Sequence, residues 1–140
     1  MNNRISRNNK EAIIKELNDY FKSVDGILFA VVHGSFLQKN TYNDIDCAVF
    51  LDVPVEHVAD YELTLETSII LELSLPAECD VRVLNNAPID FRFNTIRESI
   101  LLFSHDEDIF NNFKEQTILE YHDFSFFLNN YLRELHASRL

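Results

Sequence analysis

The stretch AVVHGSFLQKNTYNDIDCAVFLD, from Ala30 to Asp52, decides the fold. It places Gly34, one of only two glycines in the chain, directly after an apolar run. That run, Ile27 to His33, is continuous and rich in β-branched residues, which predicts a buried strand. The letters DIDCAVFLD predict a second strand, on which Asp44 and Asp46 share one face because they are two residues apart. Two like charges held that close need something positive between them.

A third carboxylate joins this pair if the next predicted strand lies beside the second. That strand reads CDVRVL, Cys79 to Leu84, and Asp80 is its second residue. On neighbouring strands, about 4.8 Å apart, the side chains of Asp44, Asp46 and Asp80 would converge on one cation. Oxygen donors without histidine suit Mg²⁺ rather than zinc. The alternative is that Asp44 and Asp46 are solvent-facing residues of a half-exposed strand.

Gly34 and Ser35 predict a phosphate-binding turn opposite these carboxylates. A glycine at a strand end lets the backbone approach a ligand, and a helical turn beginning at Ser35 would aim amide N–H groups and a hydroxyl at an anion. Lys39 either adds positive charge to this turn or is simply solvated. His33 is interpreted as a structural residue and is left out of the predicted site. A phosphate cradle facing a metal cluster is what nucleotidyl transfer requires.

The rest of the chain predicts helices around these strands. From Asn9 to Val24 apolar residues recur at helical spacing, with asparagines in front that could cap the first turn, and Gly26 follows. Pro54 fits the first turn of a second helix, which Pro76 closes. Three segments complete the order: a turn and short helix at 85–99, a short strand at 100–103, and one long or broken helix at 106–140. We expect an α/β (α+β) fold, with a small mixed sheet, helices packed against it and a long C-terminal helix.

Composition narrows the possible functions. The chain has 140 residues, of which 46% are hydrophobic, so a single domain over residues 1–140 is expected. With 23 acidic and 12 basic residues its net charge is −11, which argues against direct nucleic-acid binding and favours a basic partner. The sequence shows no signal peptide or membrane-spanning run, so we expect a cytoplasmic protein.

The two cysteines, Cys47 and Cys79, test the predicted sheet independently of any site. Their spacing and apolar surroundings indicate buried free thiols rather than a zinc site. If Asp46 and Asp80 share one face of adjacent strands, the cysteines beside them must share the opposite face. The two thiols should therefore lie near each other, under a helix.

The C-terminal segment contains more aromatic surface than one side of a helix buries in a small domain. Its apolar residues are Tyr121, Phe124, Phe126, Phe127, Leu128 and Tyr131. We expect most of this surface to belong to the core, as aromatic stripes usually do. The remainder would form an exposed patch for a partner or for a second copy of the chain.

At these residues the sequence resembles the DNA polymerase β-like nucleotidyltransferases, in particular the minimal nucleotidyltransferases (MNT). The family motif, a GS pair followed by a spacer, D-x-D and a later acidic residue, corresponds to Gly34, Ser35, Asp44, Asp46 and Asp80. Three other segments are similar to family segments: DVRVLNNAP, FNTIRESILLF and YHDFSFFLNNYLRELH. The resemblance covers most of the chain. The sequence departs from the family pattern in two places. The spacer between Ser35 and Asp44 has eight residues instead of the usual ten. The usual small-Arg-Gly after the GS pair is replaced by LQK, residues 37–39.

The resemblance implies an antitoxin that transfers AMP from ATP to a tyrosine of a HEPN-domain ribonuclease toxin. It implies Mg²⁺, two ions being expected, held by Asp44, Asp46 and Asp80, while Gly34, Ser35 and Lys39 bind the nucleotide. Asp80 is the candidate general base or shared ligand of the second metal. Two alternatives stay open: an antitoxin that neutralises by binding alone, and a transferase acting on a small molecule such as an aminoglycoside. The aromatic C-terminal helix is a candidate surface for homo- or hetero-oligomers.

Overall fold

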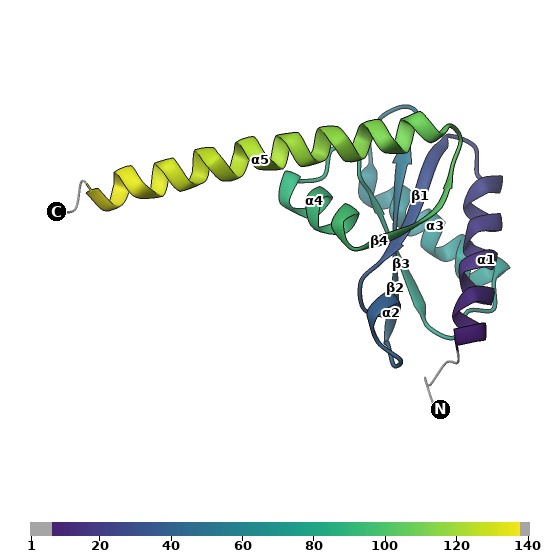
Figure 1. Ribbon diagram of the computed structural model, residues 1–140. Helices are drawn as coiled ribbons and strands as arrows, with labels where there is room; N and C mark the ends of the chain where they lie inside the picture. Colours follow the sequence, from purple (N-terminus) through teal and green to yellow (C-terminus); the bar gives the residue numbers. More distant parts are fainter. Residues whose placement is uncertain (1–6, 138–140) are drawn as a thin grey trace.

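The computed structural model describes residues 7–137, which form a four-stranded sheet with helices on both faces (Figure 1). The strands follow the order β3-β2-β1-β4. Strands β2 and β3 are parallel, whereas β1 is antiparallel to both β2 and β4, so the sheet is mixed as predicted. The elements are α1 (Arg7–Ser23), β1 (Ile27–His33), α2 (Ser35–Gln38), β2 (Asp44–Leu51), α3 (Val58–Glu72), β3 (Glu78–Val83), α4 (Ile89–Arg97), β4 (Ser99–Ser104) and α5 (Glu107–Ala137).

Alternation along the strands separates two apolar layers, and a register shift in β1 interrupts it between Ile27 and Phe29. On one face, inward residues such as Val32, Cys47 and Val81 join α1 and α3 in the larger buried cluster. On the other face, Phe29 and Ala48 join residues of α4 and α5 in a smaller cluster. The second face is only partly covered: the smaller cluster occupies one end of it, and the polar residues of β2 and β3 follow at the other end. This exposed end of the sheet is where the candidate site lies.

Three predicted helix boundaries differ from the structure. Helix α1 begins at Arg7, so Asn9 lies in its first turns rather than in front of them. Pro54 lies in the loop before α3, which begins at Val58. Parallel strands need a crossover connection, and this loop carries the chain away from the end of β2 before the helix begins. The helix also ends at Glu72, ahead of Pro76, because the following residues are extended and pack alternately on the core (Leu73, Leu75 and Ala77).

The C-terminal segment is one unbroken helix, and the prediction that most of its aromatic surface is core is wrong. Phe110 and Phe113 pack on the sheet, and Tyr121 stacks on Phe93 of α4, with 3.8 Å between ring centroids. Beyond Tyr121 the helix leaves the body (Figure 1). A helix of 31 residues extends about 46 Å, whereas four strands span roughly 20 Å. The body therefore cannot cover its outer half. Phe124, Phe126, Phe127, Leu128 and Tyr131 are all exposed.

No helix within residues 7–137 combines the length and the apolar character that a membrane crossing demands.

Candidate active site

Gly34 ends β1 in a backbone conformation that is essentially restricted to glycine, with φ 82° and ψ −156°. A Cβ atom added there would lie 2.6 Å from Oδ2 of Asp46, far inside van der Waals contact. The sequence alone suggested that a glycine is needed here because a ligand approaches the backbone. The structure adds a nearer reason, because the first group that a side chain would meet is a carboxylate of the candidate site itself.

The predicted turn after Gly34 is present as α2, and it is held in place from the first helix. Phe36 is buried, and its ring packs edge-on against Tyr42 with 4.8 Å between centroids. The ammonium group of Lys10 on α1 donates to the carbonyl oxygen of Phe36 at 2.6 Å and also to that of Lys39. Lys10 thus fixes the turn, a role that no sequence pattern indicated, since it depends on how α1 lies across the sheet. The side chain of Lys39 is exposed, and its nucleotide-binding role stays a prediction.

We expect Lys10→Met to loosen α2 and to lower the free energy of unfolding by about 1 kcal/mol, because two carbonyl groups lose a charged donor. The substitution also removes the ammonium group that lies 5.3 Å from the centroid of the Phe36 ring. Hydrogen–deuterium exchange at the amide of Lys39, which donates to the carbonyl of Ser35 at 2.9 Å, should become faster. Lys15→Met, an exposed position of the same helix, is the control. Equal protection of α2 in both variants would contradict this role for Lys10.

The structure brings the three predicted aspartates to one end of one sheet face. In the parallel pair, Asp46 is in register with Asp80, and Asp44 is in register with Glu78. All three aspartates are half-buried, while their neighbours Ile45, Cys47 and Cys79 are buried on the opposite face. Burial raises the pKa of Asp80, and the charges of Asp44 and Asp46 raise it further. The three carboxylates therefore interact electrostatically, as the alternation of β2 and β3 predicted.

The oxygen-only donor set of Asp44, Asp46 and Asp80 fits Mg²⁺ by its chemistry. Their mutual repulsion, visible in the raised pKa of Asp80, is what a bound cation would offset. Among the residues that the structure describes, no three acidic, histidine or cysteine side chains are arranged closely enough to form a metal site. The metal-binding roles of these aspartates therefore stay predictions, supported by the donor chemistry and by the shared strand face.

The cysteine prediction is confirmed. The two Sγ atoms lie 3.5 Å apart, both thiols are free and buried, and they belong to the cluster that α1 and α3 cover. The hydrogen bond between the thiols and their burial raise the pKa of Cys47 well above its ordinary value. Because Cys47 and Cys79 meet beneath the sheet, the aspartates beside them must project from the opposite face.

His33, left out of the predicted site, lies at its border. It is the cross-strand partner of Asp46, and its ring is edge-on to Phe91 of α4 with 6.3 Å between centroids. Burial lowers the pKa of His33, and the charge of Asp46 only partly opposes this effect. The sequence could have indicated this position. Alternation along β1 places His33 on the same face as Phe29 and Val31, which is the face of the carboxylates.

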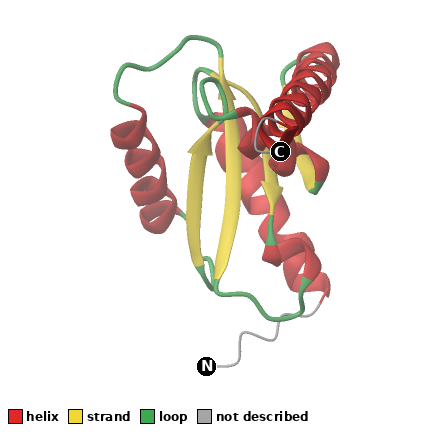
Figure 2. Ribbon diagram, turned by 90° about the vertical axis from the view of Figure 1, so that its left-hand side faces the viewer, coloured by secondary structure: helices red, strands yellow, loops and turns green. Residues whose placement is uncertain are grey.

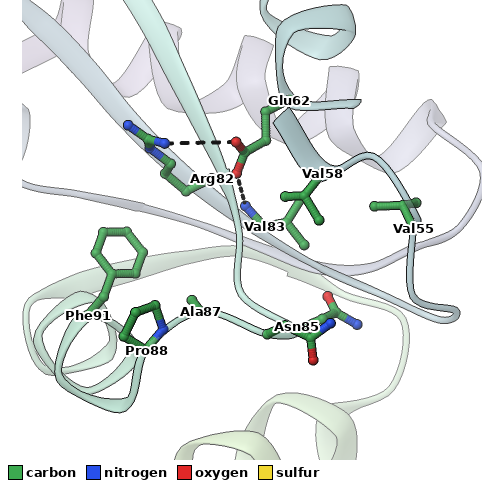
Figure 3. Close-up of a pocket in the computed structure, with 10 residues that line it drawn as sticks. Val55, Val58, Glu62, Arg82, Val83, Asn85, Ala87, Pro88 and Phe91 are labelled. Atoms are coloured by element: carbon green, nitrogen blue, oxygen red, sulfur yellow. Dashed lines mark hydrogen bonds and ion pairs between the residues drawn. The ribbon is translucent and has the colours of Figure 1, made fainter. Parts of the chain in front are cut away.

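A cavity of about 510 Å³ lies at the far end of β3, and it contains none of the predicted site residues. Figure 3 shows Arg82, Glu62 and Phe91 around it, with the turn formed by residues 85–88. Glu62 of α3 accepts a hydrogen bond from the amide of Val83 at 2.8 Å and pairs with Arg82 at 3.8 Å. These contacts tie α3 to the outer edge of β3. We therefore keep the carboxylates, rather than this cavity, as the predicted site of phosphoryl chemistry.

Comparison with protein families gives a match over residues 15–108, to the family described as polymerase beta, nucleotidyltransferase. This segment includes the glycine turn and all three aspartates. No curated protein sequence matches the chain.

Solved structures give the same fold. One is an MNT antitoxin in complex with a tri-AMPylated Shewanella oneidensis HEPN toxin. The TM-score is 0.63, the sequences are 17% identical, and the match covers 94% of this chain and 98% of that chain. A second is a toxin–antitoxin complex with AMP-PNP: TM-score 0.66, 17% identity, 93% and 98% covered. A third is the toxin–antitoxin complex MntA–HepT: TM-score 0.65, 18% identity, 93% and 98% covered. At these identities the likeness shows a shared fold.

Proposed function

Since the chain belongs to the polymerase β nucleotidyltransferase family, we propose that it is an MNT antitoxin that transfers AMP from ATP to a tyrosine of a HEPN ribonuclease toxin. The observation that carries this proposal is the placement of Asp44, Asp46 and Asp80 at one end of one face of two adjacent parallel strands. The fold neighbours support the choice of donor and acceptor, because one complex contains an AMPylated HEPN toxin and another contains AMP-PNP.

Each part of the site has a proposed role. Gly34 and Ser35 bring the backbone and a hydroxyl to the triphosphate, and Lys39 adds positive charge at the end of the same turn. The carboxylates of Asp44, Asp46 and Asp80 hold Mg²⁺. When bound, Mg²⁺ supplies the positive charge that offsets the triphosphate and the charge developing on the leaving group. The contacts of Lys10 with α2 keep the turn formed before ATP arrives, which reduces the ordering cost of binding.

The proposed reaction is a single displacement at the α-phosphorus of ATP. The phenol oxygen of the toxin tyrosine forms a new P–O bond, the bond to the β-phosphate oxygen breaks, and pyrophosphate leaves. A phenol has a pKa near 10, so its proton needs an acceptor as the bond forms. Asp80 is the proposed acceptor, with the role of shared metal ligand as the alternative. The product is an AMP–tyrosine phosphodiester on the toxin.

The binding-only alternative rests on the short spacer and on the replacement of the usual residues after the GS pair. The structure offers a specific argument for activity, because the shortened turn is well formed and anchored by Phe36 and Lys10. The small-molecule alternative is less well supported, because antitoxin chains of the solved complexes are covered over 98% of their length.

The deciding experiment mixes the protein with the product of the neighbouring gene, the candidate HEPN protein, together with Mg²⁺ and ATP labelled at the α-phosphate. We expect label on the HEPN protein, at a tyrosine identified by mass spectrometry, together with loss of its ribonuclease activity. Loss of ribonuclease activity without label would show neutralisation by binding alone. Label on an aminoglycoside but not on the HEPN protein would instead support the small-molecule alternative.

A further inference from the structure

The outer half of α5 carries an apolar stripe that the body of the protein leaves exposed. Five residues form this outer stripe: Phe124, Phe127, Leu128, Tyr131 and Leu132. Their spacing of three, four, seven and eight residues places them on one side of the helix. Each side chain is between 40% and 69% exposed. An amphipathic helix normally buries such a stripe against another element, so this surface requires a partner.

The outer stripe continues the buried side of the same helix. At 3.6 residues per turn, Tyr121 and the buried Thr117 lie on the same side of α5 as Phe124 and Leu128. Tyr121 stacks on Phe93 of α4, so this side of α5 faces α4. Helix α4 lies on the same sheet face as the three aspartates, as its Phe91 next to His33 shows. The outer stripe therefore faces the side of the molecule on which the candidate active site lies.

From this arrangement we propose that the outer stripe is the docking surface for the HEPN toxin, whose tyrosine is thereby presented to the carboxylates. The inference rests on the proposed function and adds the surface that selects the acceptor. A toxin lying against the stripe would touch α5 along one side and α4 at its end. Figure 2, in which α5 points toward the viewer, shows the strands of the sheet beside the helix.

Charge favours the toxin over a second copy of this chain as the occupant. A stable interface buries about 800 Å² on each partner and involves roughly 20–30 residues a side. The outer stripe has five residues and spans roughly 12 Å from Phe124 to Leu132, so any occupant must also contact surface beyond the stripe. Each copy also carries a net charge of −11, which opposes self-association. A partner with a basic surface gains from the same charge.

The chain offers a matched control. Phe126 and Phe127 are adjacent phenylalanines of α5, and each is 69% exposed. Only Phe127 belongs to the outer stripe, because Phe126 points to the roughly opposite side of the helix. Phe127→Ser/Leu128→Ser should raise the Kd for the toxin at least about 30-fold. Phe126→Ser should leave it within about twofold, since isolated exposed apolar residues contribute little.

The experiment measures three quantities for the wild type, the double variant and the control. These are affinity for the HEPN protein, AMP transfer at a limiting concentration of that protein, and binding of MgATP to the antitoxin alone. We expect the double variant to lose toxin affinity and transfer while it binds MgATP as the wild type does. Weakened MgATP binding in the double variant would instead place its effect at the active site and overturn the docking assignment.

The remaining outcomes separate the inference from the proposed function. Wild-type toxin binding and transfer in the double variant would overturn the inference alone. A wild-type dimer in light scattering that dissociates in the double variant, with toxin affinity unchanged, would assign the stripe to a second copy and overturn it too. If the wild type transfers no AMP, the proposed function fails, and loss of toxin binding only in the double variant still supports the docking surface. Absence of any complex with the wild type would overturn both.

Discussion

We expect Asp46→Asn to reduce the initial rate of AMP transfer by at least about a hundredfold, as the loss of one group that stabilises transition-state charge does in other enzymes. The carboxylate of Asp46 is central to the site: it is in register with Asp80, two residues from Asp44, and its Oδ2 lies against Gly34. Asparagine keeps the shape of the side chain but removes the charge of one proposed metal ligand. The rate is measured with labelled ATP and the HEPN protein.

The same substitution should leave the fold intact, which separates lost chemistry from lost structure. Burial is the main cause of the raised pKa of Asp80, and the charges of Asp44 and Asp46 raise it further. Neutralising one of the three carboxylates relieves the repulsion between them, so the melting temperature without Mg²⁺ should stay constant or rise. Asp60→Asn, in the first turn of α3, is the control and should change neither quantity. A wild-type transfer rate in Asp46→Asn would remove the carboxylates from the mechanism.

The strands and the carboxylate face could be predicted because they depend on a period of two along the chain. Once the sequence indicated strands at residues 44–52 and 79–84, alternation placed the aspartates on one face and the cysteines on the other. The Sγ–Sγ distance of 3.5 Å confirms both the pairing and the register. Ser35 could be placed in a helical turn because Gly34 precedes it at the end of a predicted strand.

Features that depend on how elements lie against one another could not be predicted. The hydrogen bonds of Lys10 to α2 and of Glu62 to the edge of β3 join segments far apart in the chain. The exposure of the outer stripe follows from the length of α5 relative to the body, whereas its composition alone indicated core. The close contact of Gly34 with Asp46 likewise requires the antiparallel pairing of β1 and β2.

Gly34→Ala should combine a loss of stability with a loss of activity. The backbone conformation of Gly34 costs a residue with a Cβ about 1–3 kcal/mol. At Gly34 the Cβ would also lie 2.6 Å from Oδ2 of Asp46, so this carboxylate must move. A displacement of about 1 Å in a catalytic group can reduce the rate about a hundredfold. We therefore expect at least about 2 kcal/mol lower unfolding free energy and about a hundredfold slower AMP transfer.

Gly26→Ala separates the cost of the backbone conformation from the cost of the collision. Gly26 has a similar φ of 89°, but its added Cβ would lie 3.4 Å from the nearest atom, Oδ1 of Asp52. This variant should lose the backbone contribution of about 1–2 kcal/mol and keep the transfer rate. Urea denaturation of Gly34→Ala, Asp46→Ala and their combination completes the test. Removing the carboxylate removes the collision, so the double variant should be more stable than the sum of the single effects predicts. Strict additivity would show that Gly34 is required for its backbone angle alone, and the displacement of Asp46 would no longer explain the loss of activity.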